Sequence, residues 1–416
     1  MKLLLSAYAC EPDRGSEPGV GWHWALEIAR LGIEIWAMTR ANNRVPIETG
    51  LRDLPDLPNL HFLYYDLPRW ARWWKHGSRG IYLYNLLWQW GAYREARRVH
   101  ARESFDQVHH ITLGGIRQPS FMGRLGIPFL FGPMGGGERA PFRLRWGYGL
   151  RGWLLDTLRD LSNAAIRFDP FMRQTFRTAE AIYVKTRQTK DVIPRRFHHK
   201  VRCQLEIGAP PPGPETAGVD VRYGDAPRSF RVLYVGRFLY WKGMHLGLRA
   251  FASVAATHSA ARLTMVGTGP DEARWRRFAE RLGVADRISW TPWVAPETLS
   301  SIYAAHDVLL FPSLHDSSGN VVLEGLAHGL PVVCLDLGGP AAIADENSSR
   351  IISVAGRDEV ATVQALAEAL REIADDAELQ RSLSEGARKR AAELTWANHV
   401  RSIYAEFGVS DAHCCD

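Results

Sequence analysis

The sequence is poor in the features that mark several large classes of protein. It has five cysteines among 416 residues and no Cys-x-x-Cys pair, so neither a disulfide framework nor a zinc site is indicated. Its longest apolar stretches have the length of strands, well short of the roughly 20 residues that span a bilayer. No zinc-finger, RNA-recognition or helix-turn-helix signature is present, which disfavours nucleic acid as a partner. We therefore expect a protein of the reducing cytoplasm without a transmembrane helix.

Length and charge indicate two dissimilar halves. A chain of 416 residues is too long for one ordinary domain and predicts two domains of roughly 200 residues. Residues 207–218, IGAPPPGPETAG, hold four prolines and three glycines, which cannot continue a helix or a sheet and mark the boundary. Residues 1–207 carry 31 lysines and arginines against 19 carboxylates, whereas the remainder carries 20 against 26. The basic half points to an anionic partner, either a membrane surface or a phosphorylated acceptor.

The order of apolar runs and glycine loops is typical of an α/β fold. The first 40 residues are expected to form strand, loop, helix and strand, and FRVLYVGR and LTMVGTGP repeat a strand that ends in a glycine turn. The opening MKLLLSAYAC faintly resembles a lipoprotein signal. Its apolar core is shorter than the roughly 7–15 residues that such a signal uses, so we expect a buried strand. Gly15, Gly19 and Gly21 do not form a dinucleotide-binding GxGxxG, which disfavours a nicotinamide enzyme.

The stretch from 312 to 333, PSLHDSSGNVVLEGLAHGLPVV, carries the strongest functional signal. An apolar run ends at Pro312, a polar loop carries Asp316, and a helix is expected to begin near Gly319. The N–H groups of such a helix point to the carboxyl edge of a parallel sheet, where a phosphate can bind. Asp316 and Glu324 would then serve two parts of one ligand. Alternatively, Asp316 only caps the helix and Glu324 is a solvated helix residue.

A second motif, VGRFLYWKG, places two cations after a strand. Arg237 and Lys242 are spaced to converge on one anion, and Gly236 and Gly243 free the backbone around them. Paired cations neutralise a diphosphate leaving group as charge develops on it, a role similar to that of a metal ion. The alternative is that both cations are merely solvated at a surface loop.

Together these motifs resemble those of glycosyltransferase family 4. The family pattern of a carboxylate, seven residues, glutamate and a small-residue run is present, with Asp316 where the family usually has glutamate. The family's V-G-R-x-x-x-x-K-G matches at every spacing, whereas Ala342 replaces an expected glutamate downstream. The resemblance implies an α/β GT-B fold, in which two Rossmann-like parallel-sheet domains face a central cleft. Residues 1–207 with a crossover helix at 395–410 would bind the acceptor, and residues 208–394 would bind the nucleotide sugar.

The resemblance also implies the reaction and its donor site. A sugar would pass from a nucleoside diphosphate sugar to a saccharide acceptor with retention of anomeric configuration, with UDP favoured over GDP and with no metal or other cofactor. The implied donor-binding residues are Gly19, Gly236, Arg237, Lys242, Gly267, Gly269, Trp293, Val294, Asp316, Ser318, Gly319, Asn320, Val321 and Glu324.

In the first half the resemblance is looser. The family has a histidine near the donor sugar at the end of a strand, where this chain has His109 and His110. Adjacent strand residues point to opposite faces, so at most one of them faces the site, and either is by default a structural histidine. With these two, the catalytic candidates are His109, His110, Arg237, Lys242, Asp316 and Glu324. The expected acceptor contacts are Glu17, Gly135, Gly136 and Glu138, in glycine-rich loops.

Residues 66–99 have the most unusual composition. Between Arg69 and Arg79, tryptophans alternate with arginines and a lysine, which suits the boundary between lipid headgroups and water. We expect this segment to be exposed and Trp88 and Trp90 to be buried, although all the tryptophans could instead belong to the core. The composition predicts a peripheral protein at an anionic inner membrane surface. The acceptor would then be a saccharide linked to a polyprenyl diphosphate, in exopolysaccharide or surface-glycan assembly.

Other functions stay open from the sequence. A glycosyltransferase could act on a soluble acceptor, and a nucleotide-sugar epimerase of the same fold would consume the donor without an acceptor. A glycoside phosphorylase would need a pyridoxal lysine site, which we do not identify. A non-enzymatic scaffold would bind the nucleotide sugar without turnover.

Overall fold

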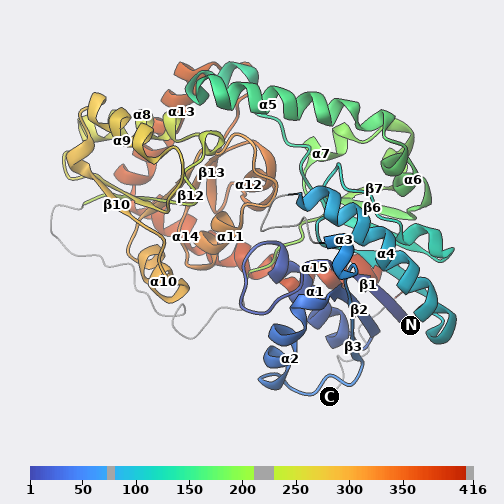
Figure 1. Cartoon of the computed structure of the whole chain (residues 1–416). Helices are drawn as coiled ribbons and strands as arrows, with labels where there is room; N and C mark the ends of the chain where they lie inside the picture. The colour runs from blue at the N-terminus through green and yellow to red at the C-terminus, as the bar shows by residue number, and fades with distance from the viewer. Residues whose placement is uncertain (73–79, 210–228, 409–416) are drawn as a thin grey trace. The chain divides into compact units, whose positions relative to one another are not determined.

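Two parallel sheets organise the chain (Figure 1). The computed structural model describes residues 1–72, 80–209 and 229–408. One unit contains residues 1–137 and 161–207 and the C-terminal residues from 396. The other contains residues 138–160 and 208–395. The expected division had assigned residues 138–160 to the first half of the chain, whereas here they pack within the second unit.

The sheet of the first unit is formed, within the described residues, by seven strands in the order β3-β2-β1-β4-β5-β6-β7. Every neighbouring pair is parallel. Leu3, Leu4 and Leu5 of β1 are fully buried, which is typical of a central parallel strand with both faces covered. The strands are β1 (Lys2–Ser6), β2 (Glu34–Arg40), β3 (Leu60–Tyr65), β4 (Gln107–His110), β5 (Phe129–Met134), β6 (Ala181–Val184) and β7 (Val201–Cys203).

The helices of the first unit include one from the C-terminal end of the chain. Helix α15 (Trp396–Ala405) packs along α1 (Glu17–Arg30), where the rings of His23 and Trp396 stack with centroids 4.6 Å apart (Figure 1). Helix α5 (Gly149–Ala164) begins within the second unit. The other helices of the first unit are α2 (Arg44–Arg52), α3 (Arg69–Arg72), α4 (Ile81–Glu103), α6 (Pro170–Thr178) and α7 (Arg187–Val192).

The second unit repeats the same plan. Across its described residues, six parallel strands have the order β10-β9-β8-β11-β12-β13. They are β8 (Arg231–Val235), β9 (Arg262–Val266), β10 (Ile288–Thr291), β11 (Val308–Phe311), β12 (Val332–Leu335) and β13 (Ser349–Ile352). The helices are α8 (Met244–Thr257), α9 (Glu272–Arg281), α10 (Pro296–Ala304), α11 (Asn320–Ala327), α12 (Gly338–Ile343), α13 (Glu359–Asp375) and α14 (Ala377–Glu393).

Most of the secondary structure expected from the sequence is confirmed. The opening segment is β1, the strand before His109 and His110 is β4, and the expected helix near Gly319 is α11. Trp88 is buried, as expected. The expectation for Trp90 was wrong: it is 41% exposed because it lies on the outer face of α4, where the Arg124 guanidinium lies 5.2 Å from its ring centroid.

The tryptophan-rich segment is only partly described. Trp70 is 78% exposed, in agreement with the expected exposure. Residues 73–79 lie outside the described residues, as does most of the proline-rich linker. No helix in the described part of the chain is long and apolar enough to cross a bilayer.

Candidate functional site

The predicted donor residues of the second unit gather at one edge of its sheet. Gly236 to Lys242 follow β8, Gly267 and Gly269 follow β9, and Trp293 and Val294 follow β10. Residues 316–321 span the loop after β11 and the start of α11. Because all these strands are parallel, their carboxyl ends lie at the same edge, where ligands of open α/β sheets bind. We call this the donor edge.

Lys242 and Asp316 form the central contact of the donor edge. The Lys242 ammonium donates to the Asp316 carboxylate, although the two residues are 74 positions apart. The same ammonium lies 4.8 Å from the centroid of the Phe311 ring. Gly243 has a φ of +69°, and a Cβ there would lie 1.9 Å from the Pro312 carbonyl oxygen, so only glycine lets the two loops approach. Arg237, five residues before Lys242 in the same loop, is exposed.

Helix α11 presents its N-terminus at the same edge. Its N-cap residue is Gly319, which has a φ of +85° and no side chain that could cap the helix. The first N–H groups, at Asn320 and Val321, therefore lack a side-chain acceptor from the cap, which suits them to an anionic ligand. Ser318 precedes the cap and is half-buried.

Glu324 lies one turn further along α11. The Tyr303 hydroxyl donates to its carboxylate at 2.9 Å. Burial raises the pKa of Glu324, and the Tyr303 hydrogen bond and the nearby His328 only partly offset this effect. Glu324 is therefore a partly buried carboxylate fixed by a hydrogen bond and not a solvated helix residue. Trp293, in contrast, is 75% exposed.

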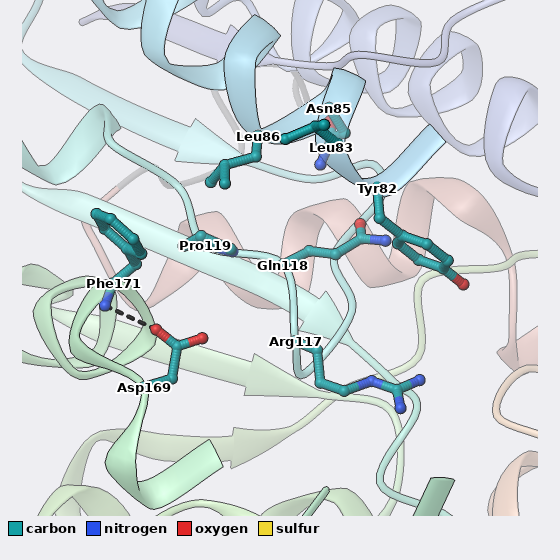
Figure 2. Close-up of a pocket in the computed structure, with 9 residues that line it drawn as sticks. All are labelled: Tyr82, Leu83, Asn85, Leu86, Arg117, Gln118, Pro119, Asp169 and Phe171. Atoms are coloured by element: carbon teal, nitrogen blue, oxygen red, sulfur yellow. Dashed lines mark hydrogen bonds between the residues drawn. The ribbon is translucent and has the colours of Figure 1, made fainter. Parts of the chain in front are cut away.

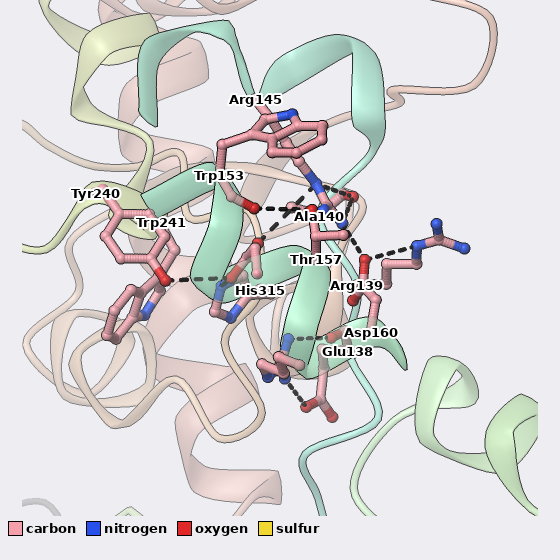
Figure 3. A network of polar contacts seen from close by, with 12 residues as sticks. Glu138, Arg139, Ala140, Arg145, Trp153, Thr157, Asp160, Tyr240, Trp241 and His315 are labelled. Carbon is pink, nitrogen blue, oxygen red and sulfur yellow. Dashed lines mark hydrogen bonds and ion pairs between the residues drawn. The ribbon is translucent and has the colours of Figure 1, made fainter. Parts of the chain in front are cut away.

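A buried polar network joins α5 to the loops that carry Tyr240 and His315 (Figure 3). Asp156 of α5 is 1% exposed and accepts hydrogen bonds from His315 at 2.9 Å and from the Tyr240 hydroxyl at 3.3 Å. The Arg145 guanidinium lies 4.0 Å from the same carboxylate and also donates to Asp160 at 2.5 Å. His315 and Tyr240 are close in sequence to Asp316 and Lys242. Asp156 therefore holds both loops that carry the central ion pair.

This network was not predicted from the sequence, because no motif marks it. Asp156 lies 84 residues before Tyr240 and 159 before His315, so only folding brings the three together. A usable signal was available in Asp156 and Asp160, since the other charged residues between positions 145 and 168 are all arginines. Glu138, a predicted acceptor residue, lies in the same segment, is 1% exposed, and has its carboxylate 4.0 Å from the Arg159 guanidinium.

The two histidines predicted to lie near the site, His109 and His110, are both buried. His109 is held by the Tyr404 hydroxyl, 2.8 Å from Nδ1, and by the Gly132 carbonyl, to which Nε2–H donates at 2.7 Å. His110 has Ser6 Oγ 3.2 Å from Nδ1, and its Nε2 has no hydrogen-bond partner among the described residues. Burial lowers the pKa of His109 to about 4 and that of His110 to about 3, so both rings are neutral at pH 7.

Glu17 begins helix α1 at the carboxyl edge of the first sheet. Its carboxylate accepts from the Leu113 N–H at 2.7 Å and lies 3.8 Å from the Lys185 ammonium. Lys185 in turn pairs with Glu206 at 2.5 Å. Nearby in the sequence, Gly19 tolerates no side chain, because a Cβ would lie 2.2 Å from the Arg14 carbonyl oxygen. The Lys185 and Glu206 pair carries no sequence motif and was not predicted.

The glycines after β5 are held in backbone contacts. Gly135 pairs with Gly115 in an isolated bridge. The Gly136 carbonyl accepts from the Asn163 side chain at 2.9 Å. Both glycines thus lie in the loop that follows the carboxyl end of β5, beside the loop that follows β4.

A pocket of about 230 Å³ opens near this edge of the first unit (Figure 2). It is lined by Tyr82, Leu83, Asn85, Leu86, Arg117, Gln118, Pro119, Asp169 and Phe171, and Figure 2 shows Tyr82 and Phe171 on opposite sides of it. Asn85 is 2% exposed, and its Oδ1 has no hydrogen-bond partner within the described chain; the same is true of Gln118 Oε1. Two buried carbonyl oxygens without donors suit a ligand with hydroxyl groups.

Metal binding has no evident place in the parts described. Residues 1–72, 80–209 and 229–408 contain no cluster of three histidine, cysteine, aspartate or glutamate side chains that could hold an ion. Among the predicted donor residues, the charged side chains are Arg237, Lys242, Asp316 and Glu324.

Comparison with known families finds a match in the part of the chain that contains the donor edge. Residues 222–390 match the family described as glycosyl transferases group 1. A D-inositol 3-phosphate glycosyltransferase from Acidothermus cellulolyticus is 35% identical over 214 residues, which cover 46% of this chain and 46% of the relative. The chain thus spans about half the length of the curated relatives that it matches.

Solved structures extend the likeness of fold to both units. The lipopolysaccharide outer core galactosyltransferase WaaB, in its apo form, is similar with a TM-score of 0.63 and 12% identity, covering 98% of this chain and 99% of that one. Anabaena HepE in complex with UDP is similar with a TM-score of 0.60 and 14% identity, covering 99% and 100%. At such identities the likeness concerns the fold alone. It confirms the predicted GT-B fold of two parallel-sheet units.

Proposed function

We propose that this chain, whose residues 222–390 match the group 1 glycosyl transferases, transfers a sugar from a nucleoside diphosphate sugar to a saccharide acceptor. The observation that carries the proposal is the contact between Lys242 and Asp316 beside the N-terminus of α11. A cation, a carboxylate and a helix dipole meet there within the region that matches the family. These are the groups that a sugar diphosphate requires.

The donor residues divide by chemistry. Lys242, Arg237 and the first N–H groups of α11 stabilise the diphosphate as it leaves, which is the role we propose for them in place of a metal ion. Glu324, held by Tyr303, accepts hydrogen bonds from the ribose. Asp316 accepts hydrogen bonds from the transferred sugar. The anomeric configuration is retained, in line with the resemblance to family 4.

UDP is the nucleotide that we propose. Anabaena HepE, whose fold is similar, was solved with UDP. The loop after β10, with Trp293 and Val294, would receive the base. Trp293 is exposed and offers a ring for stacking.

We propose that the acceptor sugar occupies the pocket between Tyr82 and Phe171. Two aromatic side chains, two carbonyl oxygens without donors and the Asp169 carboxylate match the faces and hydroxyls of a sugar ring. The pocket volume of about 230 Å³ is below the range of roughly 300–1,000 Å³ for drug-sized ligands, so it suits a single ring. The rest of the acceptor, a polyprenyl diphosphate, would lie outside the pocket.

A soluble acceptor is the second candidate. The relative from Acidothermus cellulolyticus is named for D-inositol 3-phosphate, a soluble phosphorylated polyol. The basic first half would suit such an anion as well as a lipid-linked diphosphate.

Release of nucleoside diphosphate from a panel of nucleotide sugars tests the proposal. Release that requires a polyprenyl-diphosphate saccharide is the expected result, and release with inositol phosphate instead would select the soluble acceptor. Lys242→Ala should abolish most of the activity, whereas Lys389→Ala, an exposed lysine of α14 in the same unit, should not change it. Donor consumption without any acceptor would indicate an epimerase, and binding without turnover a scaffold.

A further inference from the structure

The segment from 142 to 158 exposes an unusual number of large apolar side chains. Relative exposures are 58% for Phe142, 82% for Trp146, 86% for Leu150, 53% for Leu154 and 55% for Leu158. We call this set the α5 face. Monomeric proteins seldom expose so many neighbouring apolar side chains without a partner for them.

The α5 face cannot turn inward. Leu150, Leu154 and Leu158 recur every four residues and so form one stripe along the helix. The opposite side of α5 is fixed by Asp156, through the buried network, and by Gly152, where a Cβ would lie 2.9 Å from the Tyr240 ring. Rotation of the helix would break both contacts, so the stripe stays exposed.

The exposed charges within residues 138–160 have one sign. Within residues 138–160 the exposed charged side chains are all arginines: Arg139, Arg143 and Arg151. The carboxylates of this segment face elsewhere, since Glu138 and Asp156 are each 1% exposed and Asp160 accepts from Arg139 and Arg145. An apolar stripe whose own segment exposes cations and no anion is complementary to an anionic surface with an apolar interior.

We propose that the α5 face docks the protein on an anionic lipid bilayer. A helix with an apolar stripe and basic flanks lies in the plane of the interface, with its leucines among the acyl chains and its arginines at the headgroups. Trp146 and the partly exposed Trp153 match the preference of tryptophan for this boundary.

This surface differs from the one predicted from the sequence, which was Arg69 to Arg79. Docking at this surface would bring the protein to a lipid-linked acceptor, and only this link to the acceptor rests on the proposed function. Docking itself requires no donor, so its test uses no sugar transfer.

Flotation with vesicles tests the proposal. The full chain should bind vesicles of phosphatidylglycerol and phosphatidylcholine at low salt, and binding should fall as salt is raised. The double change Leu150→Glu and Leu154→Glu should weaken binding by about tenfold or more, because it places carboxylates in the stripe. The matched control is Val360→Glu, since Val360 is 53% exposed on α13 of the same unit, and it should bind as the wild type does.

The remaining outcomes would overturn the proposal. The proposal is wrong if the wild type does not bind anionic vesicles at low salt. It is also wrong if the double variant binds them as strongly as the wild type does. Equal binding to pure phosphatidylcholine would remove the role of the arginines. A concentration-dependent dimer that the double variant abolishes would assign the face to a second copy. Calorimetry with UDP, which should be unchanged in the double variant, shows that the donor edge is intact and separates failure of docking from failure of the proposed function.

Discussion

Replacement of Asp156 should affect both the stability and the activity of the protein, although the residue matches no family motif. Its carboxylate is 1% exposed and accepts hydrogen bonds from His315 at 2.9 Å and from Tyr240 at 3.3 Å. A buried hydrogen bond to a charged group contributes about 1.5–3 kcal/mol. Loss of one partner of a buried ion pair costs about 3–5 kcal/mol, because the other charge is left uncompensated. For Asp156→Ala we therefore expect a loss of about 3–5 kcal/mol in the free energy of unfolding.

The isosteric variant separates stability from positioning. Asp156→Asn keeps the size of the side chain and one carbonyl acceptor, so it should cost about 1–3 kcal/mol. Because His315 and Tyr240 adjoin Asp316 and Lys242, it should also lower kcat. The assays are urea denaturation followed by circular dichroism and steady-state kinetics. Glu385→Ala, an exposed carboxylate of α14, is the control and should change neither.

The pH dependence of the same group has a definite sign. Burial acts to raise the pKa of Asp156, but the His315 hydrogen bond and the charges of His315, Arg145 and Arg159 outweigh it and hold the pKa below the ordinary 3.8. A carboxyl with a lowered pKa stabilises the fold above its ordinary value and loses that contribution as the pH falls through the lowered one. The stability advantage of the wild type over Asp156→Asn should therefore shrink as the pH falls below about 4. An unfolding midpoint of Asp156→Ala equal to that of the wild type at pH 7 would refute the reasoning.

Three further predictions concern the donor edge and the buried His109. Arg237→Ala and Lys242→Ala should each reduce kcat/KM by a factor that corresponds to about 2–4 kcal/mol, and wild-type values in purified variants would show that neither cation meets the diphosphate. Glu324→Gln should weaken calorimetric binding of UDP, whereas Asp316→Asn should slow transfer and leave UDP binding nearly intact; equal losses of binding would disprove this division of roles. Burial lowers the pKa of His109 to about 4 despite the hydrogen bond to Gly132. As the pH falls, this histidine therefore becomes protonated in the unfolded chain before it does in the folded protein. The contribution of His109 to the free energy of unfolding should accordingly fall by on the order of 3 kcal/mol between pH 6.5 and 4, and His109→Gln should reduce the overall slope in urea titrations.

The elements and the donor edge could be predicted from the sequence because their signals are local. A parallel strand buried on both faces is a short apolar run, and the start of α11 follows from a glycine after a polar loop. Arg237, Lys242 and Asp316 follow strands of one parallel sheet, and topology alone brings the ends of such strands together. No knowledge of side-chain packing was needed for these predictions.

The contacts that escaped prediction are long-range or depend on which face of a helix is buried. Asp156 meets His315 across 159 residues, and Lys185 meets Glu206 only because β6 and the segment after β7 are neighbours. Trp90 was expected to be buried because its segment fits a buried amphipathic helix, but the buried side of α4 includes Trp88 and leaves Trp90 exposed. The leucines of α5 have the pattern of a core helix, and only the structure shows that Gly152 and Asp156 mark the buried side.

A structure of the full chain with a bound UDP-sugar would test the central claim most directly, through the distance from the β-phosphate oxygens to Lys242 Nζ. The account predicts a charge-assisted hydrogen bond of about 2.7–3.0 Å, with the same phosphate within reach of the first N–H groups of α11. A diphosphate bound away from the carboxyl ends of β8 and β11, with the ion pair of Lys242 and Asp316 undisturbed and distant from it, would contradict the account.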